Sequence, residues 1–182
     1  KTLMVDMNCT WDLDDVLNAK EFFVQNDIFM VEEPIRSDDT AGYIRLTKEL
    51  GGIKVAGIES EQGVSRFAEL IKADAMDVVQ ASLGWAGGFT GCRNIASTAH
   101  AFNKLYTPHS FFSAVMTAAN IQFAASQVNI PFIEAEENEN PLRTELLKEP
   151  IETDEHMNYY ITDKPGLGIE LDLDVIEKYI IK

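Results

Sequence analysis

Basic residues are scarce in this sequence, and it has no long apolar runs. The 182 residues include 15 Lys and Arg against 30 Asp and Glu, which gives a formal net charge of −15. Nucleic acids are bound by basic surfaces, so this composition argues against a nucleic-acid partner. The sequence has no Lys/Arg cluster that would suit an anionic membrane surface. No apolar run approaches the roughly 18 residues of a membrane span, and no membrane partner is expected.

Cysteine is also rare, with only Cys9 and Cys92 present. Their spacing matches neither a disulfide framework nor a metal-binding motif, which fits a reducing cytoplasm as the expected location. Cys92 falls in a helical pattern and is expected in the core. The chain begins at Lys1 and enters an apolar run almost at once, so we expect it to be part of a longer protein.

The most informative stretch runs from Phe29 to Pro34. Three apolar residues are followed by Glu32 and Glu33, and Pro34 comes directly after them. The apolar run predicts a short buried strand, and proline cannot continue a sheet ladder. Glu32 is therefore predicted at the carboxyl end of a strand, where α/β barrels place their chemistry.

Two further apolar runs end in acids, Leu3–Asp6 and Lys54–Glu59. Asp6, Glu32 and Glu59 are spaced by about 26 residues, close to the length of one strand–helix unit. Three consecutive parallel strands would bring these carboxylates to one place, where a cation must offset their repulsion. Hard oxygen ligands without Cys or His favour Mg²⁺. The alternative is that all three are solvated strand ends of an unrelated barrel.

The same period continues along the chain, with predicted strand ends at 6, 32, 59, 82, 109 and 134. Helical patterns are expected at 12–25, 62–72, 89–104, 111–127 and 174–181, with one more between a cap at Asp38 or Asp39 and Gly51-Gly52. Six such units predict an α/β fold with a parallel sheet, an incomplete TIM-type barrel, since closure takes eight strands. An open doubly wound sheet is the alternative, but its glycine-rich phosphate loop is missing.

The ordered motifs resemble the enolase superfamily, and within it the mandelate racemase/muconate lactonizing enzyme family. The matching pieces are Val5-Asp6-Met7-Asn8, Val31-Glu32-Glu33-Pro34, Gly57-Ile58-Glu59, Gly87-Gly88-Phe89-Thr90, Pro108-His109 and Asp163-Lys164-Pro165-Gly166-Leu167-Gly168. The resemblance implies that 1–182 holds strands three to eight of a modified barrel and its closing C-terminal segment. The capping domain, the first two strands and the second-strand base would precede Lys1. We therefore expect 1–182 to associate with these preceding parts of the same protein. The resemblance also implies a homo-oligomer.

The resemblance also assigns roles to particular positions. Asp6, Glu32 and Glu59 match the Mg²⁺ ligands, and Glu33 is then a neighbour of the site. His109 matches the catalytic histidine of the seventh strand. Glu134 matches an acid that binds the substrate, with Glu136 as a nearby alternative.

Two other residues are predicted to contact the substrate. Asn8 would point to the same side as Asp6 if the strand continues. Ser82 falls where the family usually has an aspartate that pairs with the histidine. A serine can orient the imidazole of His109 but supplies no charge, which makes His109 a poor strong base. Alternatively, Ser82 is a core serine and His109 has another partner.

The predicted function is a lyase: a Mg²⁺-dependent sugar-acid dehydratase of carbohydrate catabolism. Such an enzyme removes the proton α to a carboxylate and then eliminates a β-hydroxyl as water. The alternatives are a racemase or epimerase of the same superfamily, which Ser82 disfavours, and a non-catalytic relative that keeps the metal ligands.

Overall fold

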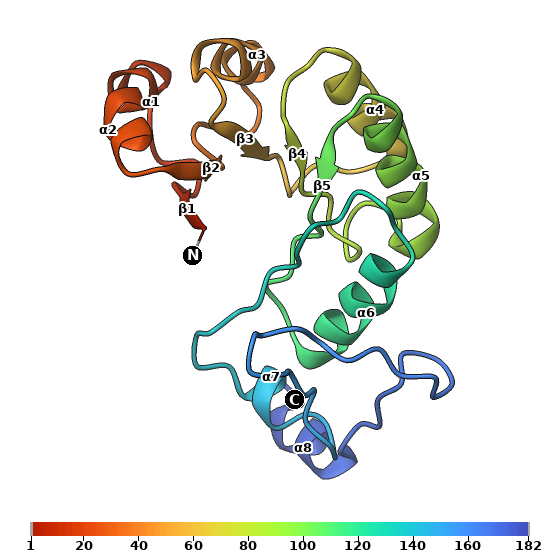
Figure 1. The fold of residues 1–182 in the computed structure, drawn as a ribbon. Helices are drawn as coiled ribbons and strands as arrows, with labels where there is room; N and C mark the ends of the chain where they lie inside the picture. The colour runs from red at the N-terminus through yellow and green to blue at the C-terminus, as the bar shows by residue number, and fades with distance from the viewer. Residues whose placement is uncertain (1, 182) are drawn as a thin grey trace.

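The computed structural model describes residues 2–181, so the two terminal residues of the predicted 1–182 domain lie outside it. Its sheet has five parallel strands in the order of the chain: β1 (Leu3–Asp6), β2 (Ile28–Glu32), β3 (Lys54–Gly57), β4 (Val78–Val79) and β5 (Leu105–Tyr106). The strands lie along the inside of an open arc, and the helices up to residue 101 lie outside it (Figure 1). This is the incomplete α/β barrel that the sequence predicts.

Residues 2–181 contain eight helices. They are α1 (Leu13–Asn18), α2 (Lys20–Gln25), α3 (Thr40–Glu49), α4 (Val64–Lys72), α5 (Gly88–Ala101), α6 (Ala114–Ala125), α7 (Pro141–Thr144) and α8 (Leu173–Tyr179). Helix α7 falls in a stretch where no helix was expected, and the others lie at the predicted places with boundaries that differ by a few residues. The helix expected at 12–25 is divided at Ala19. Asp39 is the cap of α3, because its side chain accepts a hydrogen bond from the Gly42 amide at 2.9 Å.

Apolar residues fill both faces of the strands, as expected for a parallel sheet. Side chains alternate between faces, so Val31, Val55 and Val79 pack against the helices in the main core. Met30 and Val78 belong to a smaller cluster on the inner face of the arc. Cys92 is buried in the main core, as predicted, and both cysteines are free thiols.

The predicted sixth strand, ending at Glu134, is wrong. Residues 131–134 have no strand ladder, although Phe132 packs against the inner cluster. One backbone hydrogen bond, from Tyr106 N to Asn129 O at 3.0 Å, joins the preceding residues to β5. Pro131 has no N–H to donate, so it cannot extend this pairing into a ladder.

The strands also end earlier than predicted. β3, β4 and β5 end at Gly57, Val79 and Tyr106, so that Glu59, Ser82 and His109 lie on the loops that follow. From residue 145 to 171 the chain is irregular, with isolated bridges such as Leu147 to Leu171. Among residues 2–181, no helix has the length and apolar character needed to cross a bilayer.

Candidate metal and catalytic site

The three predicted metal ligands lie at the ends of three adjacent strands. Asp6 is the last residue of β1, and its Cα is in register with that of Glu32, the last residue of β2. Glu59 follows the end of β3 by two residues. The parallel topology therefore brings the backbone positions of the three acids to one edge of the sheet, as the sequence predicts.

Each of these carboxylates contacts a different group. Asp6 Oδ1 accepts a hydrogen bond from the Asn8 amide at 2.8 Å. Glu32 Oε1 accepts one from Gln80 Nε2 at 2.7 Å. Glu59 Oε2 lies 2.7 Å from His109 Nδ1. Within residues 2–181, no three His, Cys, Asp or Glu side chains are gathered closely enough to hold a metal ion. The role of Asp6, Glu32 and Glu59 as metal ligands stays a prediction.

The electrostatics of Glu32 nevertheless suit a bound cation. The pKa of Glu32 is raised from 4.5 to about 8, first by burial and then by the nearby Glu134, with smaller contributions from Asp6 and Glu59. The hydrogen bond from Gln80 acts in the opposite direction. Four carboxylates therefore repel one another at this edge, and all of them offer hard oxygen atoms. This donor set fits a divalent cation such as Mg²⁺.

His109 is held between aromatic rings and acids. It is buried, and its ring stacks on Trp85 with centroids 5.8 Å apart and an interplanar angle of 28°. Phe112 meets it edge-on at 5.5 Å. Its Nδ1 lies 3.3 Å from Glu134 in addition to its contact with Glu59. These neighbours fix the plane and direction of the imidazole.

The charge state of His109 reflects two opposing effects. Burial lowers its pKa, but the carboxylates of Glu134 and Glu59 outweigh burial and raise the pKa to about 10. The imidazole is therefore cationic at neutral pH in this arrangement. A cationic imidazole is a proton donor, and Glu59 and Glu134 supply the negative charge that Ser82 lacks, so the expectation that His109 is only weakly basic is not met in this arrangement.

Glu134 rather than Glu136 lies in the site. Glu134 Oε2 accepts a hydrogen bond from the Ser110 amide at 2.7 Å, and its Oε1 accepts one from Gln80 at 3.0 Å. Glu136 instead accepts from Asn140 Nδ2 at 3.1 Å. The position predicted for a substrate-binding acid is thus beside His109, on a segment that lies outside the sheet and not on the predicted sixth strand.

Gln80 is part of this cluster, although the sequence pattern did not single it out. It is fully buried, and its Nε2 donates to both Glu32 and Glu134, which links β2 to the segment after α6. A signal was present: Gln80 is a polar residue at the end of the apolar run of β4. Trp85 was also missed, because nothing in the sequence shows that its ring covers His109.

Asn8 does not continue the alternation of β1. The strand ends at Asp6, and Asn8 has a left-handed backbone with φ of 47° and an exposed side chain. The condition on which its predicted direction rests, a strand continuing past Asp6, is therefore not met. Its amide holds the Asp6 carboxylate, and its contact with substrate stays a prediction.

Ser82 is fully buried and has its own hydrogen-bond partner. Its Oγ accepts from the Gly84 amide at 3.1 Å, and its carbonyl accepts from the amides of Trp85 and Ala86. This arrangement matches the alternative in which Ser82 is a core serine and His109 pairs with other groups. Ser82 thereby shapes the turn that carries Trp85.

Replacing Ser82 by Ala is expected to destabilise the protein by about 1 kcal/mol, because the Gly84 amide loses its acceptor, the hydroxyl of a buried serine. Urea unfolding followed by circular dichroism measures this change. Thr98→Ala is a matched control, since the Thr98 hydroxyl donates to the Asn94 carbonyl on the exposed side of α5. Equal free energies of unfolding for wild type and Ser82→Ala would contradict this account of the turn.

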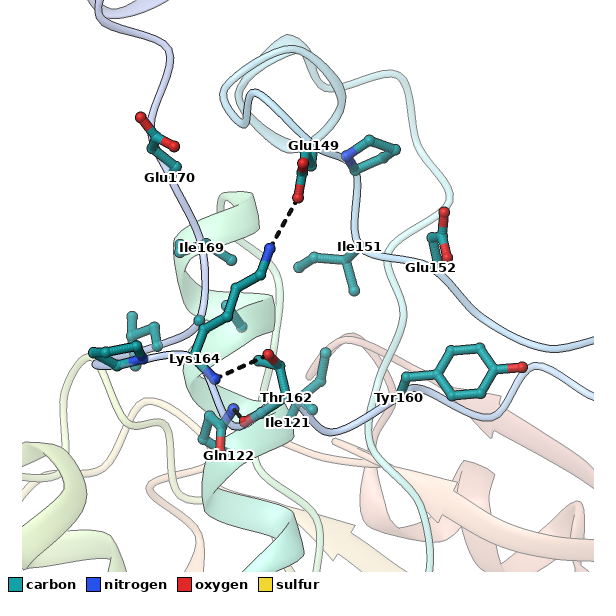
Figure 2. Close-up of a pocket in the computed structure, with 15 residues that line it drawn as sticks. Ile121, Gln122, Glu149, Ile151, Glu152, Tyr160, Thr162, Lys164, Ile169 and Glu170 are labelled. Atoms are coloured by element: carbon teal, nitrogen blue, oxygen red, sulfur yellow. Dashed lines mark hydrogen bonds and ion pairs between the residues drawn. The ribbon is translucent and has the colours of Figure 1, made fainter.

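A large pocket lies away from this cluster. It has a volume of about 890 Å³ and is formed by α6 and the irregular segment 149–170. Lys164 reaches across it to Glu149, with Nζ 2.9 Å from Oε2 (Figure 2). None of the predicted site residues lines it. The candidate site is therefore the cluster at the strand ends.

Comparison with known proteins agrees with this architecture. The model of the family described as "Enolase C-terminal domain-like" matches residues 1–175. Arabinonate dehydratase of Saccharolobus solfataricus is 30% identical over 180 residues, which are 99% of this chain and 48% of that protein. This chain thus spans about half the length of that relative.

Two solved structures extend the likeness. The 3,6-anhydro-D-galactonate cycloisomerase from Zobellia galactanivorans superposes with a TM-score of 0.92 at 29% identity, covering 100% of this chain and 51% of that one. A racemase from Streptomyces coelicolor with bound magnesium gives a TM-score of 0.85 at 26% identity, covering 97% and 46%. The match of the family model over nearly the whole chain shows that the chain belongs to the enolase C-terminal domain-like family of the enolase superfamily.

Proposed function

We propose that the protein containing this chain is a Mg²⁺-dependent sugar-acid dehydratase. The observation that carries the proposal is the position of Asp6, Glu32 and Glu59 at one edge of three adjacent parallel strands, with His109 at the same edge. The similarity to an arabinonate dehydratase supports the same reaction class. A bound Mg²⁺ would offset the repulsion among these carboxylates and draw charge from a substrate carboxylate.

The residues of this chain have distinct proposed roles. Asp6, Glu32 and Glu59 would hold the cation, and Glu134 would bind the substrate. His109 would donate a proton to the β-hydroxyl as it leaves, so that water is released after the α-proton has been removed. Both carboxylate contacts of His109 are made through Nδ1, so Nε2 is the ring nitrogen that would donate this proton. The base that removes the α-proton is expected on the second barrel strand, before Lys1.

A screen of sugar acids with the full-length protein and Mg²⁺ tests the proposal. A dehydratase converts a hexonate, pentonate or hexarate to a 2-keto-3-deoxy acid, which reacts with semicarbazide and is lighter than the substrate by one water. Omission of Mg²⁺ with EDTA present is the control. Absence of product across the library, with Mg²⁺ bound, would exclude a dehydratase acting on these sugar acids.

A cycloisomerase is the second candidate, since the structure with a TM-score of 0.92 carries that name. Its product has the same mass as its substrate, so mass spectrometry separates the two reactions. Sugar-acid lactones and anhydro sugar acids belong in the same screen for this reason. A product of unchanged mass from one of these compounds would favour the second candidate. Deuterium exchange at the α-carbon without elimination would instead favour the racemase.

A further inference from the structure

Glu33 follows the predicted ligand Glu32, but its side chain has a different environment. It is only 6% exposed, and its Oε1 accepts hydrogen bonds from two backbone amides beyond β3. The Ile58 amide donates at 2.6 Å and the Glu59 amide at 3.2 Å. The carboxylate of Glu33 therefore holds the backbone of Glu59, a predicted ligand, from the neighbouring strand.

The other oxygen of Glu33 reaches the first strand. Its Oε2 accepts a hydrogen bond from the Cys9 thiol, and the Cys9 amide donates to the Glu33 carbonyl at 2.8 Å. Burial, and then the contact with Glu33, raise the pKa of Cys9 to about 12, so the thiol keeps its proton and remains a donor at neutral pH. Glu33 is thus bonded to the loop that follows Asp6 as well as to the loop that carries Glu59.

The backbone at all three strand ends adopts a left-handed conformation. The φ angles are 47° at Asn8, 58° at Cys9, 41° at Glu33 and 61° at Ile58. Such angles cost energy in residues other than glycine, and they persist where surrounding contacts enforce them. The hydrogen bonds of Glu33 are contacts of this kind, because they join Cys9 and Ile58 to one buried side chain.

Gly57 shows how closely this carboxylate is packed. Gly57 has a φ of 133°, and a Cβ added there would lie 2.9 Å from the Tyr43 hydroxyl and 3.2 Å from Glu33 Oε1. Tyr43 is itself fully buried, so it has little freedom to move away. The end of β3 is therefore shaped to admit the Glu33 side chain.

We propose that Glu33 is a positioning residue that clamps the loops after β1 and β3 to the end of β2, and so sets the spacing of Asp6, Glu32 and Glu59. Glu33 is not itself a ligand in this scheme, since both of its oxygens are engaged by Cys9, Ile58 and Glu59. The inference rests on the proposed function, because it assumes that the three acids bind one cation. Residues that orient metal ligands by hydrogen bonds, without binding the metal themselves, are a general feature of metal sites.

Isothermal titration of Mg²⁺ into the full-length protein tests the clamp. Glu33→Ala is expected to weaken Mg²⁺ binding by roughly 10- to 100-fold, the usual cost of losing an outer partner of a metal site. Glu33→Gln retains an oxygen for the Ile58 and Glu59 amides and is expected to bind Mg²⁺ nearly as well as wild type. Glu21→Ala, on the exposed surface of α2, is the control and should bind as wild type.

Hydrogen–deuterium exchange of backbone amides, measured in EDTA, tests the hydrogen bonds of Glu33 independently of Mg²⁺ binding. Glu33→Ala should accelerate exchange of the Ile58 and Glu59 amides, whereas Glu33→Gln and Glu21→Ala should not. If wild type binds no Mg²⁺, the proposed function fails, and accelerated exchange in Glu33→Ala alone still supports the clamp. Unchanged exchange in Glu33→Ala would overturn it. If wild type binds Mg²⁺, an unchanged Mg²⁺ affinity in Glu33→Ala, or equal losses in Glu33→Ala and Glu33→Gln, would also overturn it.

Cys9→Ala provides a milder variant if Glu33→Ala does not fold. It removes the hydrogen bond from the Cys9 thiol to Glu33 Oε2 and leaves both amide contacts of Oε1. A smaller loss of Mg²⁺ affinity, of a few-fold, is expected because one of the three tethers is gone. Mg²⁺ affinity equal to that of wild type would count against the tether from Glu33 to β1.

Discussion

Replacing Glu32 by Gln is expected to reduce the affinity of the full-length protein for Mg²⁺ by more than about 100-fold, since loss of an outer partner alone costs roughly 10- to 100-fold. Glu32 ends the middle strand of the three that carry the predicted ligands. Isothermal titration of Mg²⁺ measures the change. Glu69→Gln, on the exposed face of α4, is the matched control.

In the absence of metal, Glu32→Gln should stabilise the folded protein at pH 8 relative to wild type. The folded-state pKa of Glu32, about 8, lies above the ordinary value of 4.5, so the folded protein binds this proton more tightly than the unfolded chain does. Stability in EDTA should therefore fall as the pH rises from about 4.5 to about 8, and Glu32→Gln should remove the part of this fall that Glu32 causes. The raised pKa of His109, about 10, adds a separate fall that begins near pH 6.5 and that the substitution leaves in place. Thermal unfolding in EDTA at pH 5 and pH 8 measures both.

Two outcomes would contradict this account of Glu32. The first is Mg²⁺ binding by Glu32→Gln that equals wild type, which would exclude Glu32 as a ligand. The second is a metal-free Glu32→Gln protein that unfolds at a lower temperature than wild type at pH 8. That result would mean that the Glu32 carboxylate stabilises the fold, in conflict with its burial beside Glu134.

His109→Asn is expected to lower kcat by about 100- to 10,000-fold on the substrate that the screen identifies, which is the usual contribution of general acid–base catalysis. The substitution removes the proton donor and keeps a polar group of similar shape. Mg²⁺ binding should persist, because His109 is not among the predicted ligands. Steady-state kinetics and Mg²⁺ titration together measure these effects.

His100→Asn is the matched control for this experiment. His100 lies in the last turn of α5 with an exposed side chain, away from the strand ends. Its substitution should leave kcat unchanged. A kcat of His109→Asn equal to that of wild type would show that His109 takes no part in the reaction. Loss of Mg²⁺ binding would instead mean that His109 positions Glu59 as a ligand.

Periodicity accounts for how much of the fold was predictable. Apolar runs that end in Asp6 and Glu32 predicted strands that end at those residues, because apolar runs on both faces are a direct requirement of a parallel sheet. The later strand ends were placed two or three residues too far along. Ladder pairing depends on backbone geometry, which apolar composition does not report. At Pro131 the missing N–H prevents a strand from forming, although the residues that follow are apolar.

The positions of the acids and of His109 at the ends of the strands were predictable, but their contacts were not. Asp6, Glu32, Glu59, His109 and Glu134 all lie at the same edge of the sheet, as the spacing and the family resemblance indicated. Gln80, Trp85 and Glu33 belong to the same region, and their partners are 24 to 54 positions away in the chain. Contacts over such separations depend on side-chain directions that no local pattern encodes.

The sequence by itself determined the order of strands and helices, the family, and the acidic residues at the strand ends, because each follows from residue type and spacing along the chain. Only the tertiary structure decided which groups these acids contact. Gln80 joins Glu32 to Glu134, His109 turns to Glu59 rather than to Ser82, and Glu33 binds the backbone of two neighbouring loops. Those choices arise from burial and mutual repulsion, which exist only once the strands lie side by side.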